Sequence, residues 1–409
     1  SIGGTNNTYV KLIGDCEFDA VTVEAGDTLD LNGQRMECSG HFSSAGGCTI
    51  DNTGDNTAFI YLSSSNLDGA WTNDSKVHII AQPTGNITSG FDFNNSAIAS
   101  TAKRVINAGA YEIDSAISMS DDPSNLIIAS GTFDINGEAA LNANNLTVAT
   151  GATLDADSAT VTVAGDFTTS GGLLGASCLT GNGSSYKATS ASAALEFTTT
   201  KFTVEFWAKW TGDGAPAADQ SIFDFYNSST NRINGIIRNA GDDPHKLQWL
   251  IGDSAGNYDV IQSVGAELND SKWHHHAVTY DATTFKAYAD GKLVYSEVVT
   301  IDRANAAGTL YIGSSGGNEY FAGSIDEVRI WDDDRTETEI RDNMFSEDVA
   351  GDAGLLHQWS FNEGTGVAAE DTATASPHTD RDLTVISGSW AAGGTLTWTG
   401  GGTPSAGTL

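Results

Sequence analysis

Residues 202–208 read Phe-Thr-Val-Glu-Phe-Trp-Ala, a run in which alternate side chains are apolar. A period of two is typical of a β-strand with one face in a core. Runs of the same period follow at 276–280, 286–289 and 292–295. Between the last two lies Asp290-Gly291, a dipeptide typical of a two-residue hairpin turn. These residues predict a β-sandwich in the C-terminal half of the chain.

One helix is expected in this half. Thr336 and Glu339 have the spacing of a capping box, which predicts a helix from there to about Phe345. The remainder favours short strands joined by tight turns, because the 409 residues include 46 Gly and only 6 Pro.

The N-terminal part contains an internal repeat. Residues 125–131, Asn-Leu-Ile-Ile-Ala-Ser-Gly, return 20 residues later as Asn-Leu-Thr-Val-Ala-Thr-Gly at 145–151. A longer alignment without gaps places residues 21–47 over 146–172, at an offset of 125 residues. A period near 20 with Gly or Asn at the corners is typical of a β-solenoid, whose stacked coils share one interior. We therefore predict a β-solenoid-like stalk over residues 1–175.

Two segments show no such repeat. Residues 50–115 hold strand-like runs at 58–62 and 77–80, which leaves either an inserted hairpin or irregular coils. Residues 396–409 are rich in Gly, Thr and Ser, and we expect them to form a flexible tail.

The charge of the chain excludes some classes of partner. It carries 19 Lys and Arg against 53 Asp and Glu, a net charge of −34. A nucleic-acid binder needs a basic surface to displace counterions, and anionic membranes repel so acidic a chain. The acidic groups serve either solubility in a salty medium or, in part, the binding of Ca²⁺. The sequence also has no run of 18 apolar residues that would span a membrane.

Four cysteines occur, and no two of them form a CxxC motif. Zinc and thioredoxin-like sites are therefore not expected. Cys38 and Cys48 either pair across a solenoid turn or are small buried apolar residues, and we favour the second interpretation.

Several motifs of the C-terminal half resemble, in order, the laminin-G-like jelly roll of the concanavalin A-like class. They are FTVEFW at 202–207, WHHHAVTYD at 273–281, ADGKL at 289–293, LYIG at 310–313 and GSIDEVRIW at 323–331. The segment GLLHQWSFNEGTG at 354–366 looks like the strand and loop that follow this motif in bacterial and phage members. The repeats at 125–172 resemble the β-solenoid stalks of marine phage fibre proteins. The resulting fold class is all-β, a β-solenoid-like region at 1–175 followed by a concanavalin-type β-sandwich jelly roll at 176–395.

The resemblance also implies a ligand and a metal. Members of this family are mostly glycan-binding or adhesive modules, often with one structural Ca²⁺. The aspartate of the GSIDEVRIW strand, here Asp326, is the usual side-chain ligand, with backbone carbonyls around Asn182 as its partners. That loop departs from the acidic pattern of the family, because it reads LTGNGSSY and carries Thr180 and Ser185 at those places. The predicted metal residues are thus Asp326 and Asn182.

Candidate catalytic groups are few. Hydrolases on this type of sandwich carry paired carboxylates at alternate positions of one strand, facing the same cleft. Asp326 and Glu327 are adjacent, so strict alternation points them to opposite faces, and the acids at 332–334 fit a solvated turn. No GxSxG, HExxH or P-loop motif occurs. The sequence therefore predicts that the protein is not an enzyme.

Histidines and tryptophans of this half are interpreted as structural. His274 and His276 share one face of their strand, and two histidines without a third ligand make a weak metal site. The tryptophans fit core positions by strand alternation, while one or two exposed aromatic residues are expected to stack on sugar rings. The tryptophans concerned are Trp207, Trp249, Trp273, Trp331 and Trp359.

The expected function is that of a virion structural protein, a phage fibre or capsid decoration whose solenoid spaces a lectin-like head from the particle. Each coil of a solenoid adds about 4.8 Å to its length. The expected partners are a glycan or host-surface ligand, other virion or surface proteins, and further copies of the chain, because multivalency strengthens weak glycan contacts. The expected location is the virion surface or the extracellular space.

Two alternatives stay open. A secreted or cell-surface bacterial adhesin would have the same architecture. A polysaccharide depolymerase would need a pair of acids in a groove between coils.

Overall fold

The computed structural model of the chain contains two compact units. The first, the solenoid unit, comprises Ser1–Ser170 and Gly393–Leu409, and the second, the jelly-roll unit, comprises Gly171–Ala392. The residues that the structure describes are 8–40, 42–44, 48–54, 56, 58–62, 67–68, 71–72, 77–81, 103–107, 125–134, 140–143, 145–155, 160–163, 167–169, 173–190, 195–197, 201–212, 216–239, 245–264, 268, 270–299, 301, 306–316, 318–347, 349–374, 381–387, 389–391, 395–397 and 405–406.

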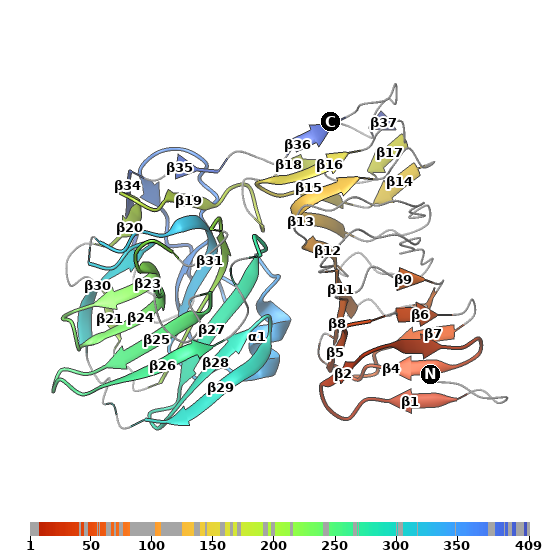
Figure 1. Cartoon of the computed structure of the whole chain (residues 1–409), viewed down its shortest axis with the longest axis horizontal. Coiled ribbons are helices and arrows are strands. Elements are labelled where there is room, and N and C mark those ends of the chain that lie inside the picture. Colours follow the sequence, from red (N-terminus) through yellow and green to blue (C-terminus); the bar gives the residue numbers. More distant parts are fainter. Residues whose placement is uncertain are drawn as a thin grey trace. The chain divides into compact units, whose positions relative to one another are not determined.

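The described strands of the solenoid unit form a stack of parallel coils (Figure 1). Its longest sheet runs through the whole stack, and each strand pairs in parallel with the strand of the next coil. In stacking order its strands are β2 (Cys16–Phe18), β5 (Arg35–Cys38), β8 (Ala58–Leu62), β11 (Val77–Ala81), β12 (Lys103–Asn107), β13 (Asn125–Asp134), β15 (Asn145–Val148) and β18 (Phe167–Thr169).

Two further faces complete the coils. At the N-terminal end, one face contains β1 (Tyr9–Lys11), β4 (Thr28–Asp30), β7 (Cys48–Asp51) and β10 (Trp71–Thr72), and the other contains β3 (Val21–Val23), β6 (Phe42–Ser44) and β9 (Leu67–Asp68). Further along the stack, β16 (Ala152–Asp155) pairs with the second half of β13, and β14 (Ala140–Ala143) pairs with β17 (Thr160–Val163). The chain visits the three faces in turn, so one regular coil consists of three strands and three corners.

The register of the long sheet confirms the sequence repeat. Asn125 lies opposite Asn145, and the next three residues of each segment pair in the same order. The early strands β3, β4 and β5 begin seven residues apart, so a coil of about 20 residues contains three such units. The alignment at an offset of 125 residues superimposes β3 on β15, which lie on different faces. The repeated unit is therefore one strand with its corner rather than a whole coil.

Apolar side chains fill the solenoid interior, and glycines form corners. Leu29 and Leu154, which the repeat aligns, are both fully buried in one cluster. Gly26 and Gly151, which the repeat also aligns, both have a positive φ, of 85° and 69°. Glycine adopts this conformation without the steric cost of a Cβ atom.

Part of the irregular segment 50–115 belongs to the stack. β8 and β11 pair in parallel over five residues, with Val77 opposite Ala58. The strands of a hairpin would be antiparallel, so these two runs form irregular coils. Most of the segment after residue 81 lies outside the described residues.

The jelly-roll unit interrupts a coil of the solenoid. β18 ends at Thr169, and the chain returns to the stack as β36 (Thr395–Thr397) and β37 (Ser405–Ala406). β36 pairs in parallel with β16, and β37 pairs in parallel with β17. These two strands differ from the flexible tail expected for 396–409, because their backbone groups find partners in the preceding coil.

All four cysteines are free thiols. Cys38 and Cys48 are buried in the apolar interior of the solenoid and form no disulfide. They pack as small apolar residues, as the sequence favoured.

The jelly-roll unit is a sandwich of two antiparallel sheets. In order, the eight-stranded sheet contains β29 (Lys292–Val298), β28 (Thr284–Ala289), β27 (His274–Tyr280), β22 (Phe202–Trp210), β31 (Ala322–Trp331), β19 (Leu179–Asn182) and β35 (Ser389–Trp390), with β32 (Leu355–Trp359) beside β31. The nine-stranded sheet contains β26 (Tyr258–Val264), β25 (Leu247–Gly252), β24 (Arg232–Ile237), β23 (Gln220–Tyr226), β30 (Ala306–Ile312), β20 (Lys187–Thr189), β34 (Leu383–Ile386) and β33 (Ala368–Ala369), with β21 (Leu195–Phe197) beside β30.

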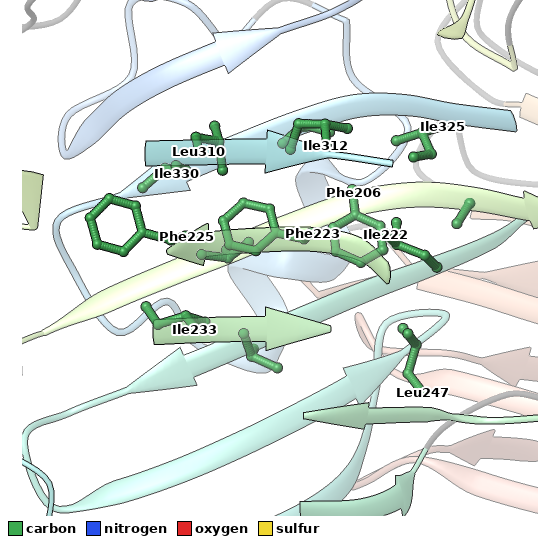
Figure 2. Close-up of a cluster of buried hydrophobic side chains, with 14 of the residues drawn as sticks. Phe206, Ile222, Phe223, Phe225, Ile233, Leu247, Leu310, Ile312, Ile325 and Ile330 are labelled. Atoms are coloured by element: carbon green, nitrogen blue, oxygen red, sulfur yellow. The ribbon is translucent and has the colours of Figure 1, made fainter. Parts of the chain in front are cut away.

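Aromatic and branched side chains from both sheets fill the space between them (Figure 2). The Phe206 ring of the eight-stranded sheet lies 6.5 Å from that of Phe223 and 6.0 Å from that of Trp249, both of the nine-stranded sheet. The five tryptophans assigned to the core are all buried, with at most 3% of each exposed. Of the five, Trp249 and Trp359 belong to the core between the sheets, whereas Trp207 and Trp331 are buried on the other side of the eight-stranded sheet.

The hairpin and the helix are confirmed. Asp290 and Gly291 have φ values of 48° and 71°, as a two-residue hairpin turn requires. α1 (Glu337–Asn343) begins after Thr336, which forms the predicted capping box with Glu339. Among the described residues, no helix is long and apolar enough to cross a membrane.

The two ends of the jelly-roll unit lie side by side. β19 and β35 pair antiparallel, with Leu179 opposite Trp390. The N–H of Ala391 also donates to the carbonyl of Cys178, at 3.0 Å. A unit whose ends meet can be inserted at one corner of another fold without separating the strands that flank it.

The solenoid should therefore fold without the inserted unit. We expect that deleting residues 171–392 leaves a folded β protein, because Ser170, Gly393 and Gly394 then form a corner between β18 and β36 as long as the corner between β15 and β16. Far-UV circular dichroism and thermal unfolding test this expectation, with the separately produced segment 171–392 as the companion sample. If the joined solenoid is unfolded while the separately produced segment 171–392 is folded, the solenoid requires the inserted unit in order to fold.

Candidate functional site

The two sheets of the jelly-roll unit differ in what covers their outer faces. Every residue of β22, β27 and β32 in the eight-stranded sheet is buried, so both faces of this sheet are covered at these strands, whereas the edge strand β29 is partly exposed. β25 and β34 of the nine-stranded sheet instead alternate between buried residues and residues that reach solvent. Such alternation is typical of a sheet with one solvated face. The central strands β23 and β24 are buried except at Gln220, Tyr226 and Arg232, so the outer face of the nine-stranded sheet is open only in part, and a ligand can be sought where its residues reach solvent.

Arg329 is the centre of a buried ionic network on the covered face. The side chain is 1% exposed, and its Nη2 and Nη1 atoms lie 2.9 Å from Glu327 and 3.6 Å from Glu205. Glu205 also accepts a hydrogen bond from Trp331 Nε1 at 2.9 Å and lies 3.5 Å from His275 Nε2. Buried charges need such partners, because an uncompensated charge in the interior costs several kcal/mol.

The same face holds the segment that follows α1. Arg329 donates hydrogen bonds to the carbonyls of Asn343 and Ser346. Trp207 Nε1 donates to the carbonyl of Met344 at 2.7 Å. These donors satisfy backbone carbonyls that would otherwise need water, so the segment stays in place as a cover of the sheet.

The two adjacent acids of β31 lie at a β-bulge. Glu327 has a φ of 48°, and the pairing of β31 with β22 shifts register here. Ile325 and Val328 both belong to the core, so Asp326 and Glu327 between them lie on the covered side. The prediction that they point to opposite faces is wrong, because the extra residue of a bulge breaks the period of two. Both acids are at most 1% exposed, which keeps them from a substrate in solution.

Asp326 accepts three backbone hydrogen bonds. Its Oδ2 accepts from the N–H groups of Leu173 and Leu174 at 2.8 and 3.1 Å, and its Oδ1 accepts from that of Glu327 at 3.0 Å. Burial raises the pKa of Asp326 well above its ordinary range, and the charge of Glu327 adds to this effect. A fully buried carboxylate facing N–H dipoles does not fit Ca²⁺, which takes about six to eight oxygen ligands.

Asn182 lies apart from Asp326. It pairs with Ala322, four positions along β31 from Asp326, which separates the two by roughly 13 Å. The Asn182 side chain accepts hydrogen bonds from the N–H groups of Ser184 and Ser185 and so closes a turn. The structure thus does not bring the two predicted metal residues together. Among the described residues, no three His, Cys, Asp or Glu side chains are grouped to hold a metal.

The three consecutive histidines are all buried. His274 lies between two carboxylates, 2.8 Å from Asp290 and 3.2 Å from Asp270. His275 and His276 pack against aromatic rings of β22. These contacts agree with the structural role that the sequence suggested for the run.

The open face carries a polar and aromatic cluster on four adjacent strands. Asp224 and Tyr226 of β23 lie opposite Asn234 and Arg232 of β24. On the other side of β23, Asp224 lies opposite Tyr311 of β30. We call this cluster the tyrosine face and define it by Lys187, Asp224, Tyr226, Arg232, Tyr311 and Ser315.

A buried carboxylate fixes the arginine of the tyrosine face. Arg232 Nε and Nη2 donate to the two oxygens of Asp224 at 2.9 and 2.6 Å. Nη2 also donates to Ser315 Oγ at 2.7 Å. The Asp224 side chain is fully buried, whereas 13% of the Arg232 side chain is exposed. A bidentate pair of this kind holds the guanidinium plane in one orientation at the surface.

Two tyrosine rings extend the face toward a lysine. The Tyr226 ring centroid lies 5.3 Å from Arg232 Cζ and 6.5 Å from the Tyr311 ring centroid. Lys187 Nζ lies 5.6 Å from the Tyr311 centroid. All four residues are partly exposed. The face thus offers apolar rings for stacking, with cationic hydrogen-bond donors at both ends.

Sequence patterns predicted exposed aromatic residues without identifying Tyr226 and Tyr311 as those residues. A signal was present, since polar residues alternate with apolar ones in 224–226 and 232–234. The pairing of β23 with β30 joins residues far apart in the chain, and no local pattern reveals it.

Comparison with known proteins agrees with the fold. Residues 180–341 match the family model Laminin G 3, described as the Concanavalin A-like lectin/glucanases superfamily. The jelly-roll unit is therefore a laminin-G-like, concanavalin A-like domain, as its motifs predicted. No curated protein matches the chain.

Solved structures with a similar fold include three that concern carbohydrates. A proposed carbohydrate-binding protein from Bacteroides ovatus is 22% identical, with 54% of this chain and 62% of that chain covered and a TM-score of 0.40. This chain thus spans less than two thirds of that protein. The CBM40 of the Ruminococcus gnavus IT-sialidase, bound to α2,3-sialyllactose, is 17% identical, with coverage of 40% and 95% and a TM-score of 0.30. Domain 4 of an extracellular arabinanase from Geobacillus stearothermophilus, bound to arabinotriose, is 19% identical, with coverage of 42% and 89% and a TM-score of 0.31.

Loss of the buried guanidinium should destabilise the jelly-roll unit strongly. We expect Arg329→Met to lower its free energy of unfolding by about 3–5 kcal/mol, because Glu205 and Glu327 then stay buried without a cation. Urea unfolding followed by tryptophan fluorescence measures the change. The control is Arg238→Met, which removes a half-exposed ion pair with Asp219 and should cost less than about 1 kcal/mol. Equal losses in both variants would contradict the role of the network.

The stability contributed by His274 should depend on pH. Burial lowers the pKa of His274, but the carboxylates of Asp290 and Asp270 outweigh burial and raise it to about 10. A raised histidine pKa stabilises the fold fully below about pH 6.5, and the gain is lost as pH rises through about 10. His274→Gln should therefore destabilise the protein more at pH 6 than at pH 10 in urea unfolding. An equal or larger loss at pH 10 would show that His274 is not charged in the fold.

Proposed function

We propose that the jelly-roll unit is a non-catalytic glycan-binding head and that the tyrosine face is its binding surface. The observation that carries the proposal is the pair of partly exposed tyrosines beside a fixed, partly exposed guanidinium on the open sheet. Pyranose rings have an apolar face that stacks on an aromatic ring, and their hydroxyl groups bond to cationic and hydroxyl side chains.

Rigidity supports this assignment. Because Asp224 and Ser315 already hold Arg232, binding of a ligand loses little conformational entropy from that side chain. Tyr226 and Tyr311 stand on paired central strands of the sheet rather than on loops. The face is thus formed before a ligand arrives.

The positions and contacts of the acidic residues in this unit favour a binding role over a catalytic one. The superfamily includes both lectins and glucanases, so the family match favours neither. Glycoside hydrolysis needs two carboxyl groups that reach the scissile bond, about 5–9.5 Å apart. Both oxygens of Asp224 are bonded to Arg232, and Asp326 and Glu327 are buried on the other sheet. The proposal therefore assigns no enzymatic step, and it assigns no role to Ca²⁺.

We further propose that the solenoid unit is the spacer of a virion fibre or decoration protein, with a cell-surface adhesin as the alternative. A stack of paired coils is stiff, and its length grows by about 4.8 Å with each coil. Several copies on one particle would combine weak glycan contacts into strong attachment to a host surface.

Removal of either tyrosine ring should weaken glycan binding. We expect Tyr226→Ala and Tyr311→Ala each to lower affinity roughly 5- to 10-fold, which corresponds to about 1–1.4 kcal/mol of lost stacking. A glycan array with the full chain identifies ligands, and titration calorimetry then compares the variants. The control is Leu293→Ala, which truncates an apolar side chain 39% exposed on the eight-stranded sheet. Unchanged binding by both tyrosine variants would remove the tyrosine face from the proposal.

A further inference from the structure

The tyrosine face carries two of the few basic residues of an acidic protein. The chain has only 19 basic residues against 53 acidic ones, yet two of the basic residues flank the two tyrosine rings. Arg232 lies on β24 and Lys187 on β20, with β23 and β30 between them. Three strand steps separate these two strands, a distance of roughly 14 Å. A ligand lying across the rings would meet a cation at each end.

We propose that the tyrosine face binds an acidic glycan, a polysaccharide whose pyranose rings carry carboxylate groups. This inference rests on the proposed glycan-binding function and adds the chemical class of the ligand. The rings of Tyr226 and Tyr311 contact the apolar faces of the sugars, and the carboxylates pair with Lys187 and Arg232.

Arg232 retains donors for a ligand after its contacts within the protein. A guanidinium has five N–H groups. In Arg232 the Nε group donates one hydrogen bond to Asp224, and the Nη2 group donates one to Asp224 and one to Ser315. Among the described residues, Nη1 makes no hydrogen bond. The two N–H groups of Nη1 can therefore bond to a carboxylate oxygen of the ligand.

The buried carboxylate beneath Arg232 sets how much positive charge the face presents. Burial raises the pKa of Asp224 to about 7, against the opposing effect of Arg232. The other groups that face Asp224 are Tyr311 from β30, and Ser315 and Glu319 from the loop after β30. As the pH falls through about 7, protonation of Asp224 becomes more favourable, and Arg232 is then less neutralised. The face should then bind an anionic ligand more tightly than it does at higher pH.

The test compares one polymer in two charge states. Polygalacturonate carries a carboxylate on each ring, and its methyl ester has the same rings without the charge. We expect the full chain to bind polygalacturonate at least tenfold more tightly than the ester in titration calorimetry at pH 6. Lys187→Gln should lower the affinity for polygalacturonate about fivefold or more and leave that for the ester unchanged. The control Lys286→Gln, on β28 of the other sheet, should change neither.

The pH dependence provides a second readout. Affinity for polygalacturonate should fall severalfold between pH 6 and pH 8.5, although the carboxylates of the polymer stay ionised throughout. Asp224→Asn should remove this dependence, and circular dichroism checks that the variant is folded. A pH-independent affinity in the wild type would contradict the coupling to Asp224.

Each other outcome has a defined meaning. Equal binding of the ester, or binding restricted to neutral glycans on an array, overturns the inference and leaves the proposed function in place. If poly-L-glutamate binds as tightly as polygalacturonate, charge alone is recognised. This outcome overturns the inference that the tyrosine rings contact the sugar rings. Failure to bind any carbohydrate overturns both the inference and the proposed function.

Discussion

The buried guanidinium of Arg329 constrains the rest of the jelly-roll unit. Its charge needs partners on the covered side, and these come from β22, from the bulge of β31, from the last residue of α1 and from the backbone after it. The segment after α1 is thereby held over the eight-stranded sheet, whose outer face is closed to ligands. The outer face of the nine-stranded sheet is open in part, and the tyrosine face lies there. The placement of the candidate site thus follows from where the fold buries its strongest charge.

Two arginines with the same chemistry have different roles because their burial differs. Arg329 is 1% exposed, and its partners include two carboxylates and two backbone carbonyls, so its donors serve the fold. Arg232 has one carboxylate, one hydroxyl and an exposed edge, so part of its donor set can serve a ligand. Neither role is visible in the sequence, where both residues stand in alternating strands.

Sequence patterns predicted the features that depend on neighbouring residues. The 20-residue repeat gave the register of β13 and β15, Asp290-Gly291 gave a hairpin, and Thr336 with Glu339 gave the start of α1. The bulge at Glu327 escaped prediction because a positive φ at a glutamate has no sequence signature. The tyrosine face could not be predicted from the sequence, because β23 and β30 meet only through the topology of the sandwich. Asp326, taken from a family resemblance, accepts three hydrogen bonds from backbone N–H groups in this chain.

The interruption of a solenoid coil by the jelly-roll unit bears on how the chain folds. β18 and β36 belong to the same coil, although the chain between Thr169 and Thr395 is on the order of 200 residues long. Closing so long a loop in an unfolded chain carries a large entropic cost. Once the inserted unit has folded, its paired ends shorten the effective loop to a few residues, because β19 and β35 lie side by side. Completion of the coil is therefore favoured late in folding, with the jelly roll acting as the folded link that brings the returning chain back to the stack.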